Sequence, residues 1–472
     1  MGKITFLGIF TAIFLLLFIN LQIPFLLKAT FAINFVLLWI ITYYNIFVER
    51  KFSPFLGVFI VFNLLFFIVA PLLQIDDIIS KGYNEGGKYI QNFPFKEGFA
   101  IRANLYILFF NLIFFSAYLY FKSRTIKIKT NLKISYNNIP IALVILSIVT
   151  FLIVIVNVST ILFQYQNEFY KEAEQTSVAN YLLVQKFLFF IPLAGVILSH
   201  YYLKNYNKNS KNYLIVLFLL LYFLIVVLLL KNPLTEKRNT LGPIYITLIF
   251  IFFRKILDTN FKVVRFMFFS MVLLFPILTI FTHSRNTLSE MISRPHILVE
   301  NVKLLHVTDA FNSLHYDAYP NFLATIDYCD QKPVTYGAQL GPTFFFFVPR
   351  GFWHSKPEVT GFKIGNYLID RYGFNFNNLS NPYISEAYIN FKLPGIALFA
   401  IILALIFVYL IKWLEGLDVL KSAFAFYFSI YLMYFLRGDL ANGFAFIIAT
   451  FIAVILVPKG LFILINHYAK QK

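Results

Sequence analysis

Residues Tyr213–Leu230 read YLIVLFLLLYFLIVVLLL, an apolar run without a charged side chain. An α-helix needs about twenty such residues to cross a hydrocarbon core of about 30 Å. In lipid, each backbone N–H and C=O has to be satisfied within its own segment, so a helix is the expected structure. Similar runs recur along the whole chain, which indicates a polytopic membrane protein.

The composition supports this interpretation, because 59% of the 472 residues are hydrophobic and only 13% are charged. Alternating segments of about ten residues, the pattern of transmembrane β-strands, are not seen. The predicted fold class is therefore an all-α polytopic membrane protein with about twelve transmembrane helices. We expect these spans near residues 4–27, 30–48, 54–73, 101–121, 139–163, 179–203, 213–230, 240–253, 265–282, 393–411, 422–436 and 444–466.

The net charge of +18 comes largely from Lys and Arg in the connections between the apolar runs. In a soluble protein such a charge would suggest nucleic acid, but here the pattern is typical of orientation signals, and no nucleic-acid partner is expected. Alternate connections carry Lys and Arg within residues 50–51, 122–133, 204–211 and 254–265. The sequence thus predicts a multi-pass protein of the cytoplasmic (inner) membrane with both termini in the cytoplasm.

A long segment, residues 283–392, separates transmembrane helices 1 to 9 (residues 1–282) from helices 10 to 12 (residues 393–472). It is rich in Pro, Gly, Tyr and Asn and too aromatic for a disordered linker, so we expect a large folded extracytoplasmic element. The active site is therefore expected to face the periplasm or the exterior.

Three stretches of this part of the chain carry a family resemblance. They are LHYDAYPNFLATID (Leu314–Asp327), FVPRGFWHSKP (Phe347–Pro357) and SNPYISEAYINFKLPG (Ser380–Gly395). Together they resemble the Wzy-type O-antigen and oligosaccharide repeat-unit polymerases, and the second stretch is the most specific. The chain departs from the family pattern at His354, where proline is frequent, and at Lys392, where glycine is usual.

The resemblance covers about residues 230–445 and includes LRGD at Leu436–Asp439. It implies a GT-C-like glycosyltransferase that transfers a growing undecaprenyl-diphosphate-linked polysaccharide onto a lipid-linked repeat unit, without a cofactor or metal. The implied partners are undecaprenyl-diphosphate-linked glycans, membrane lipids and a chain-length regulator protein. An O-antigen ligase shares this chemistry and differs in its acceptor.

A polysaccharide flippase or transporter also has about twelve spans, but transporters usually place their ionisable residues within spans. Here the acidic residues gather in the long external segment, which favours an enzyme.

A departing lipid diphosphate requires fixed positive charge, which arginine supplies through bidentate hydrogen bonds. The candidates for diphosphate binding are Arg238, Arg285, Arg350, Arg437 and Lys356, with Arg350 and Arg437 ranked highest. An arginine at the edge of a span also serves as an anchor to lipid headgroups, so each has a structural alternative.

The acceptor hydroxyl needs a proton acceptor, and we predict Glu386, with His315, Asp317 and His354 as the other candidates. Glu386 is expected on an extended approach to a span; its alternative role is a carboxylate at a helix N-terminus. Trp353, Tyr316 and Tyr388 are predicted to stack on sugars, although an interfacial aromatic belt produces the same composition.

No metal site is expected, because His306, Asp309, His315 and Asp317 form no tight i, i+4 pair. Cys329 is the one cysteine, and we expect a buried structural thiol.

Overall fold

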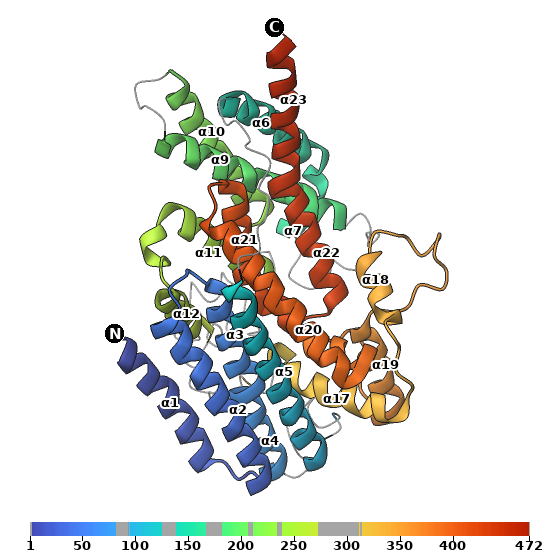
Figure 1. Cartoon of the computed structure of the whole chain (residues 1–472). Helices are drawn as coiled ribbons and strands as arrows, with labels where there is room; N and C mark the ends of the chain where they lie inside the picture. The colour runs from blue at the N-terminus through green and yellow to red at the C-terminus, as the bar shows by residue number, and fades with distance from the viewer. Residues whose placement is uncertain are drawn as a thin grey trace, which may run out of the picture.

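A computed structural model describes residues 2–81, 93, 95–124, 138–166, 182–205, 211–233, 238–271, 311 and 314–471. Within these ranges every regular element is a helix (Figure 1). Ten of the helices are long and apolar enough to cross a membrane: residues 3–20, 25–48, 54–80, 97–123, 139–156, 183–205, 212–230, 383–415, 419–437 and 440–469. The all-α polytopic class is therefore confirmed.

The other two predicted spans do not appear among these ten. The apolar run near residues 240–253 forms α11 (Arg238–Phe252), whose 15 residues are shorter than a crossing of the hydrocarbon core requires. The run near 265–282 is described only as far as Met271, where α12 (Asn260–Phe269) has just ended.

One group of helices packs around a central apolar helix (Figure 1). It contains α1 (Lys3–Asn20), α2 (Phe25–Tyr43), α3 (Pro54–Leu64), α4 (Ala70–Lys81) and α5 (Glu97–Ser123). The span Pro54–Ser80 joins α3 to α4, and 94% of the residues in its most apolar 18-residue window are buried, because α2 and α12 pack against α3. Phenylalanine rings fill the contacts, as where Phe59 stacks on Phe114 with ring centroids 4.2 Å apart.

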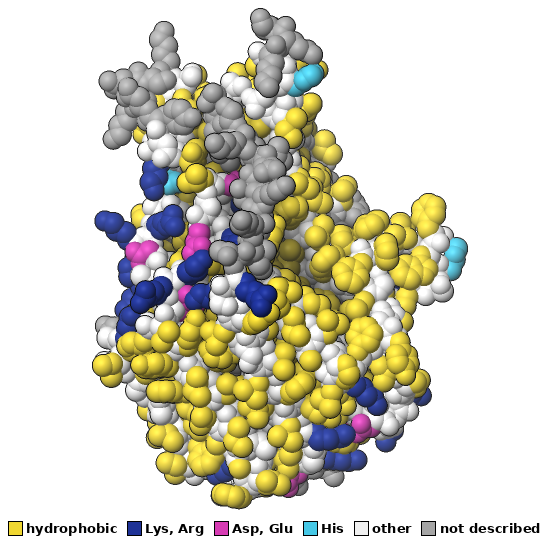
Figure 2. All heavy atoms as spheres, viewed as in Figure 1, with side chains coloured by type: hydrophobic (Ala, Val, Ile, Leu, Met, Phe, Trp, Pro, Cys, Tyr) yellow, Lys and Arg dark blue, Asp and Glu magenta, His cyan; other side chains and the backbone are white. Residues whose placement is uncertain are grey.

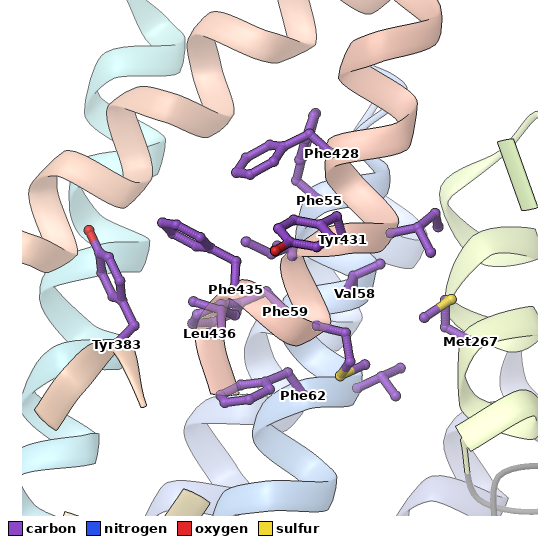
Figure 3. Packing of buried hydrophobic residues seen from close by; sticks show 14 of the residues in the cluster. Phe55, Val58, Phe59, Phe62, Met267, Tyr383, Phe428, Tyr431, Phe435 and Leu436 are labelled. Carbon is purple, nitrogen blue, oxygen red and sulfur yellow. The ribbon is translucent and has the colours of Figure 1, made fainter. Parts of the chain in front are cut away.

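A second group contains α6 (Ile139–Val156), α7 (Val158–Gln166), α9 (Ile191–Asn205) and α10 (Lys211–Leu230), with α22 (Leu440–Phe451) and α23 (Val457–Gln471) beside them (Figure 1). Between the groups runs α21 (Val419–Arg437), which contacts α3, α9, α11 and α20. The side chains of α21 near its end, Phe435 and Leu436, lie toward Phe59 and Phe62 of α3 (Figure 3).

Polar contacts identify the two ends of the bundle. At one end Lys3 donates to the carbonyl of Ile46, at 2.8 Å, and Lys51 pairs with Glu415 at 3.1 Å. Lys459 of α23 pairs with Asp418 at the start of α21, so the first and last helices reach the same end. At the other end Arg102 pairs with Asp330. The assignment of the first end to the cytoplasm stays a prediction.

The predicted extracytoplasmic element is built onto that second end. It contains η9 (Leu314–Tyr316), α17 (Ala318–Gln331), η10 (Ala338–Leu340), α18 (Gly341–Phe344) and α19 (Thr360–Tyr372). In α17 every side chain from Ala318 to Cys329 is buried. This helix is therefore a layer packed on α5 and α20, and not a separate surface loop.

The helix α20 (Tyr383–Glu415) is broken at Lys392, where φ is 49° and ψ is −137°. The Tyr383 hydroxyl donates to the carbonyl of Phe399, 3.2 Å away. Residues sixteen apart in a continuous helix would be about 24 Å apart, so the two segments fold back on each other as a helical hairpin. Gly395 permits this, because a Cβ there would lie 2.1 Å from the Ala387 carbonyl oxygen.

The hairpin corrects the prediction of an extended approach to the span, and it shows where Glu386 lies. The expected extended approach to the span is a short buried helix, Tyr383–Phe391, which carries Glu386 into the bundle. The span expected from residue 393 corresponds to the second segment of α20. Glu386 is in the first turn of the first segment, the position of its alternative role.

Candidate functional site

The end of α21 meets α17, α19, α20 and α22 in a set of bonded polar side chains. We call this set the polar cluster: Asp317, Asn321, Thr325, Thr360, Ser380, Asn381, Glu386, Arg437 and Asp439. All but Ser380 and Arg437 are buried, and these two are half-buried.

Arg437, the last residue of α21, is held from one side. Its Nε and Nη2 donate to Asp317 Oδ1 at 3.2 and 3.0 Å, and Nη2 also donates to the Leu314 carbonyl. The guanidinium carbon lies 5.9 Å from the centre of the Phe66 ring, in the middle of the central span. Its Nη1 makes no hydrogen bond within the described residues. The side chain of Arg437 is 21% exposed, so an anion can reach a pre-oriented donor.

Asp317 joins α17 to the start of α20. Besides Arg437, its Oδ1 accepts a hydrogen bond of 2.7 Å from the Ser380 hydroxyl, which in turn accepts from Asn321 at 3.3 Å. One helical turn further along α17, Thr325 donates to Asn381 Oδ1 at 3.2 Å. The carboxylate is 3% exposed, so its ion pair with Arg437 is shielded from solvent on the Asp317 side.

Two buried carboxylates, Glu386 and Asp439, are linked through adjacent residues of α19. Thr360 Oγ1 donates to Glu386 Oε2 at 2.8 Å, and the Gly361 N–H donates to Asp439 Oδ2 at 2.9 Å. Glu386 is 1% and Asp439 5% exposed. Gly361 is required, because a Cβ there would lie 2.1 Å from the Leu379 carbonyl oxygen.

Asp439 has a second role as the N-cap of α22, since its Oδ1 accepts from the Ala441 N–H at 3.0 Å. Burial raises the pKa of Asp439, against the opposing effect of its backbone hydrogen bonds. The two carboxylates therefore tie the start of α19 to α20 and to α22.

A small, mainly apolar cavity lies beside the polar cluster. Its lining includes Asn63, Tyr383 and Leu436, and Leu436 directly precedes Arg437 in the chain. Most of the other side chains that line the cavity are phenylalanines. The cavity is therefore apolar, and its lining adds no charged group to the polar cluster.

The stretch Phe347–Pro357, the most specific part of the resemblance, lies outside the cluster. Arg350 donates to the carbonyls of Lys356 and Pro357, at 2.6 and 3.4 Å. Lys356 donates to the carbonyls of Phe345, Phe346 and Val348, at 2.9 to 3.2 Å. Within the described residues no bond joins either cation to the polar cluster. The structure thus bonds Arg350 to the backbone of its own stretch, whereas Arg437 is bonded to Asp317 and Leu314.

Two of the three predicted sugar-stacking rings are buried in the bundle. Tyr316 is 1% exposed and packs against Phe66 and Phe311, with centroids 5.6 and 4.7 Å away. Tyr388 is 3% exposed and packs against Tyr106. Neither ring offers a face to a ligand, which corrects both predictions. Trp353 is half-buried beneath Lys356, whose ammonium lies 5.9 Å from its ring.

Among the predicted proton acceptors, Asp317 is bonded directly to Arg437, and two residues before it in the chain is His315. It is half-buried in η9, directly after Leu314, whose carbonyl accepts from Arg437. His354 is exposed on the other loop. Glu386 is enclosed.

Several predicted residues lie outside the described residues: Arg285, His306 and Asp309, and the side chain of Arg238 at the start of α11. The part of the chain that the structure describes holds no group of three side chains suited to a metal ion.

Sequence reasoning missed Asp439 and Thr360. An Asp directly before an apolar run is an N-cap signal, so Asp439 was detectable as a helix start. Its proximity to Glu386 was not, because it depends on the fold of α19. No family model, curated protein or solved structure matches the chain.

Proposed function

We propose that this protein is a membrane glycosyltransferase of the GT-C-like, metal-independent kind. It would transfer a growing undecaprenyl-diphosphate-linked polysaccharide onto a lipid-linked repeat unit at the outer face of the cytoplasmic membrane. The observation that supports this most is Arg437, which Asp317 orients and whose Nη1 has no hydrogen bond among the residues that the structure describes. Two of the three resembling stretches and LRGD meet around it, although Asp317 and Arg437 are 120 residues apart.

In the proposed reaction the acceptor hydroxyl attacks the anomeric carbon of the donor chain. The bond from that carbon to the diphosphate oxygen breaks, and undecaprenyl diphosphate leaves with the bonding electron pair. Arg437 receives the departing negative charge, where a fixed cation is most effective. His315, at the half-exposed edge of the cluster, takes the hydroxyl proton. Glu386 and Asp439 position α19 and touch no substrate.

A strain that lacks this protein tests the proposal. We expect lipid-linked glycan that stops at one repeat unit on the outer face, and its extension to long chains when the wild-type protein is restored. Long chains that accumulate unattached would indicate a ligase instead. Single units retained on the inner face would indicate a flippase.

A transporter is a second candidate, because of one specific observation. Glu386 is buried in the first segment of the broken helix α20, against the segment that forms the span, and transporters often use ionisable groups on broken helices. An acidic residue is therefore closer to a span than the sequence indicates. Purified protein in vesicles separates the two candidates: a polymerase elongates repeat units supplied on its own side, and a transporter moves them without elongation.

A further inference from the structure

We propose that residues Phe344–Trp353, called here the aromatic loop, lie within the lipid of the bilayer beside α22. The loop would anchor the element that carries α19 to the membrane. This inference concerns a surface outside the polar cluster and does not depend on the reaction proposed above.

The aromatic loop exposes four phenylalanine rings. Phe344 and Phe345 are each 53% exposed, Phe347 is 66% exposed and Phe352 is 87% exposed. Figure 2 shows apolar side chains over the projection next to α18, beside the apolar surface of the bundle. Contiguous exposed apolar surface of this kind marks an interaction site.

The base of the loop lies at the depth of a span. Phe344 and Phe346 pack against Phe444, with ring centroids 5.5 and 6.4 Å apart. Phe444 is in the second turn of the span Leu440–Ala469, about 6 Å from its first residue at 1.5 Å per residue. A loop that leaves the protein at this level enters lipid and not water.

Several backbone carbonyls in and directly after the loop accept hydrogen bonds from Arg350 and Lys356, which lowers the cost of placing them in lipid. Lys356 donates to three carbonyls of the loop, and Arg350 donates to two carbonyls that follow it. Non-helical backbone in the hydrocarbon region is costly unless its carbonyls have partners. Both cations are thus bonded to backbone carbonyls, while four phenylalanine rings of the loop are exposed. Trp353 beside Lys356 is a combination typical of the membrane interface.

Phospholipid acyl chains are therefore the occupant that fits the loop. A protein partner or a second copy of the chain would also cover phenylalanine rings, but neither explains why the base of the loop packs at span depth. Capped carbonyls are needed in lipid and are unnecessary in water.

Site-directed spin labelling tests this in the full-length protein. A nitroxide is attached to Phe352→Cys in detergent, the protein is then reconstituted into phosphatidylcholine vesicles, and collisions with oxygen and with a water-soluble nickel complex are compared. Asp370→Cys on the exposed side of α19 is the matched control. Burial raises the pKa of the native Cys329 thiol to about 12, so it does not compete for the label.

We expect oxygen to relax the label at residue 352 several-fold more than nickel, and the reverse at residue 370. Stronger relaxation by nickel at residue 352 would overturn the proposal, because the loop would be in water. Protection from both reagents would also overturn it, because a protein would then cover the rings.

A second measurement avoids the added label. In the Trp39→Phe, Trp413→Phe variant, Trp353 is the one remaining tryptophan. Its fluorescence should fall at least twofold in vesicles with brominated acyl chains. Unchanged fluorescence, together with strong quenching by aqueous acrylamide, would contradict the proposal.

Discussion

The polar cluster and the stretch Phe347–Pro357 both belong to the second end of the bundle, yet they are built in opposite ways. The cluster is buried and its bonds join five helices, from Asp317 to Asp439. The Phe347–Pro357 stretch is largely exposed, and its two cations bond to backbone close by in the chain. The most specific motif in the sequence is thus not the one that the fold places in its interior. Substitutions of the same kind in both regions test this difference.

The largest expected effect follows from His315→Asn. Loss of a general base typically lowers the rate by at least 100-fold, and an asparagine cannot accept the proton. The measurement is glycan elongation by purified protein in vesicles. His354→Asn in the Phe347–Pro357 stretch is the matched control and should leave the rate within a few fold of wild type. Equal rates for His315→Asn and wild type would remove His315 from the proposed reaction.

Arg437→Lys should lower the rate by about 10- to 100-fold. An ammonium keeps the charge but loses the planar fork, and a charge-assisted hydrogen bond contributes about 1.5–3 kcal/mol. The expression level and thermal stability in detergent are measured alongside, since the ion pair with Asp317 also holds η9. A wild-type rate for this variant would show that the Arg437 guanidinium is structural.

Glu386→Ala should destabilise the protein by about 1–3 kcal/mol, because the buried Thr360 hydroxyl loses its acceptor. Glu386→Gln keeps an acceptor oxygen and should retain most of the activity. Thermal unfolding and glycan elongation are measured on both variants. If Glu386→Gln abolishes elongation in a stable protein, Glu386 is the general base that the sequence predicts. It would then not serve only to position α19.

Arg350→Lys should have a small effect, less than about tenfold on the rate. The Arg350 guanidinium holds two carbonyls of its own stretch, one of them at 3.4 Å, and a lysine preserves part of this contact. The sequence alone ranks Arg350 with Arg437, so the two Lys variants compare the regions directly. If Arg350→Lys lowers the elongation rate as much as Arg437→Lys does, Arg350 is as important as the sequence alone predicts.

The smallest expected effect is the reaction of the Cys329 thiol, in α17, with maleimide in the folded protein. Its pKa is raised to about 12 by burial, so the thiol stays protonated at pH 8 and should react with maleimide only after denaturation. Asp370→Cys, on the exposed side of α19, should react within minutes under the same conditions. Mass spectrometry of the labelled protein gives the result. Rapid modification of Cys329 in the folded protein would show that this side of α17 is accessible to solvent.

Much of the fold could be predicted, because long apolar runs have few alternatives in a membrane. The runs at 213–230 and 422–436 lie in observed helices. The hairpin of α20 could not be predicted, because it depends on the contact between Gly395 and Ala387. An extended segment that leads into a span and a short helix that folds back on a span have similar sequence patterns. Arg437 was identified from LRGD, but its partner Asp317 is 120 residues away.

The amino-acid sequence determined that this chain is a helical membrane protein, because the cost of burying each residue in lipid depends mainly on its own type and adds along a segment. Only the tertiary structure decided which polar residues share the interior. Burial of Glu386 beside Asp439, and exposure of the Phe347–Pro357 stretch, result from packing between segments far apart in the chain. No local pattern encodes that pairing.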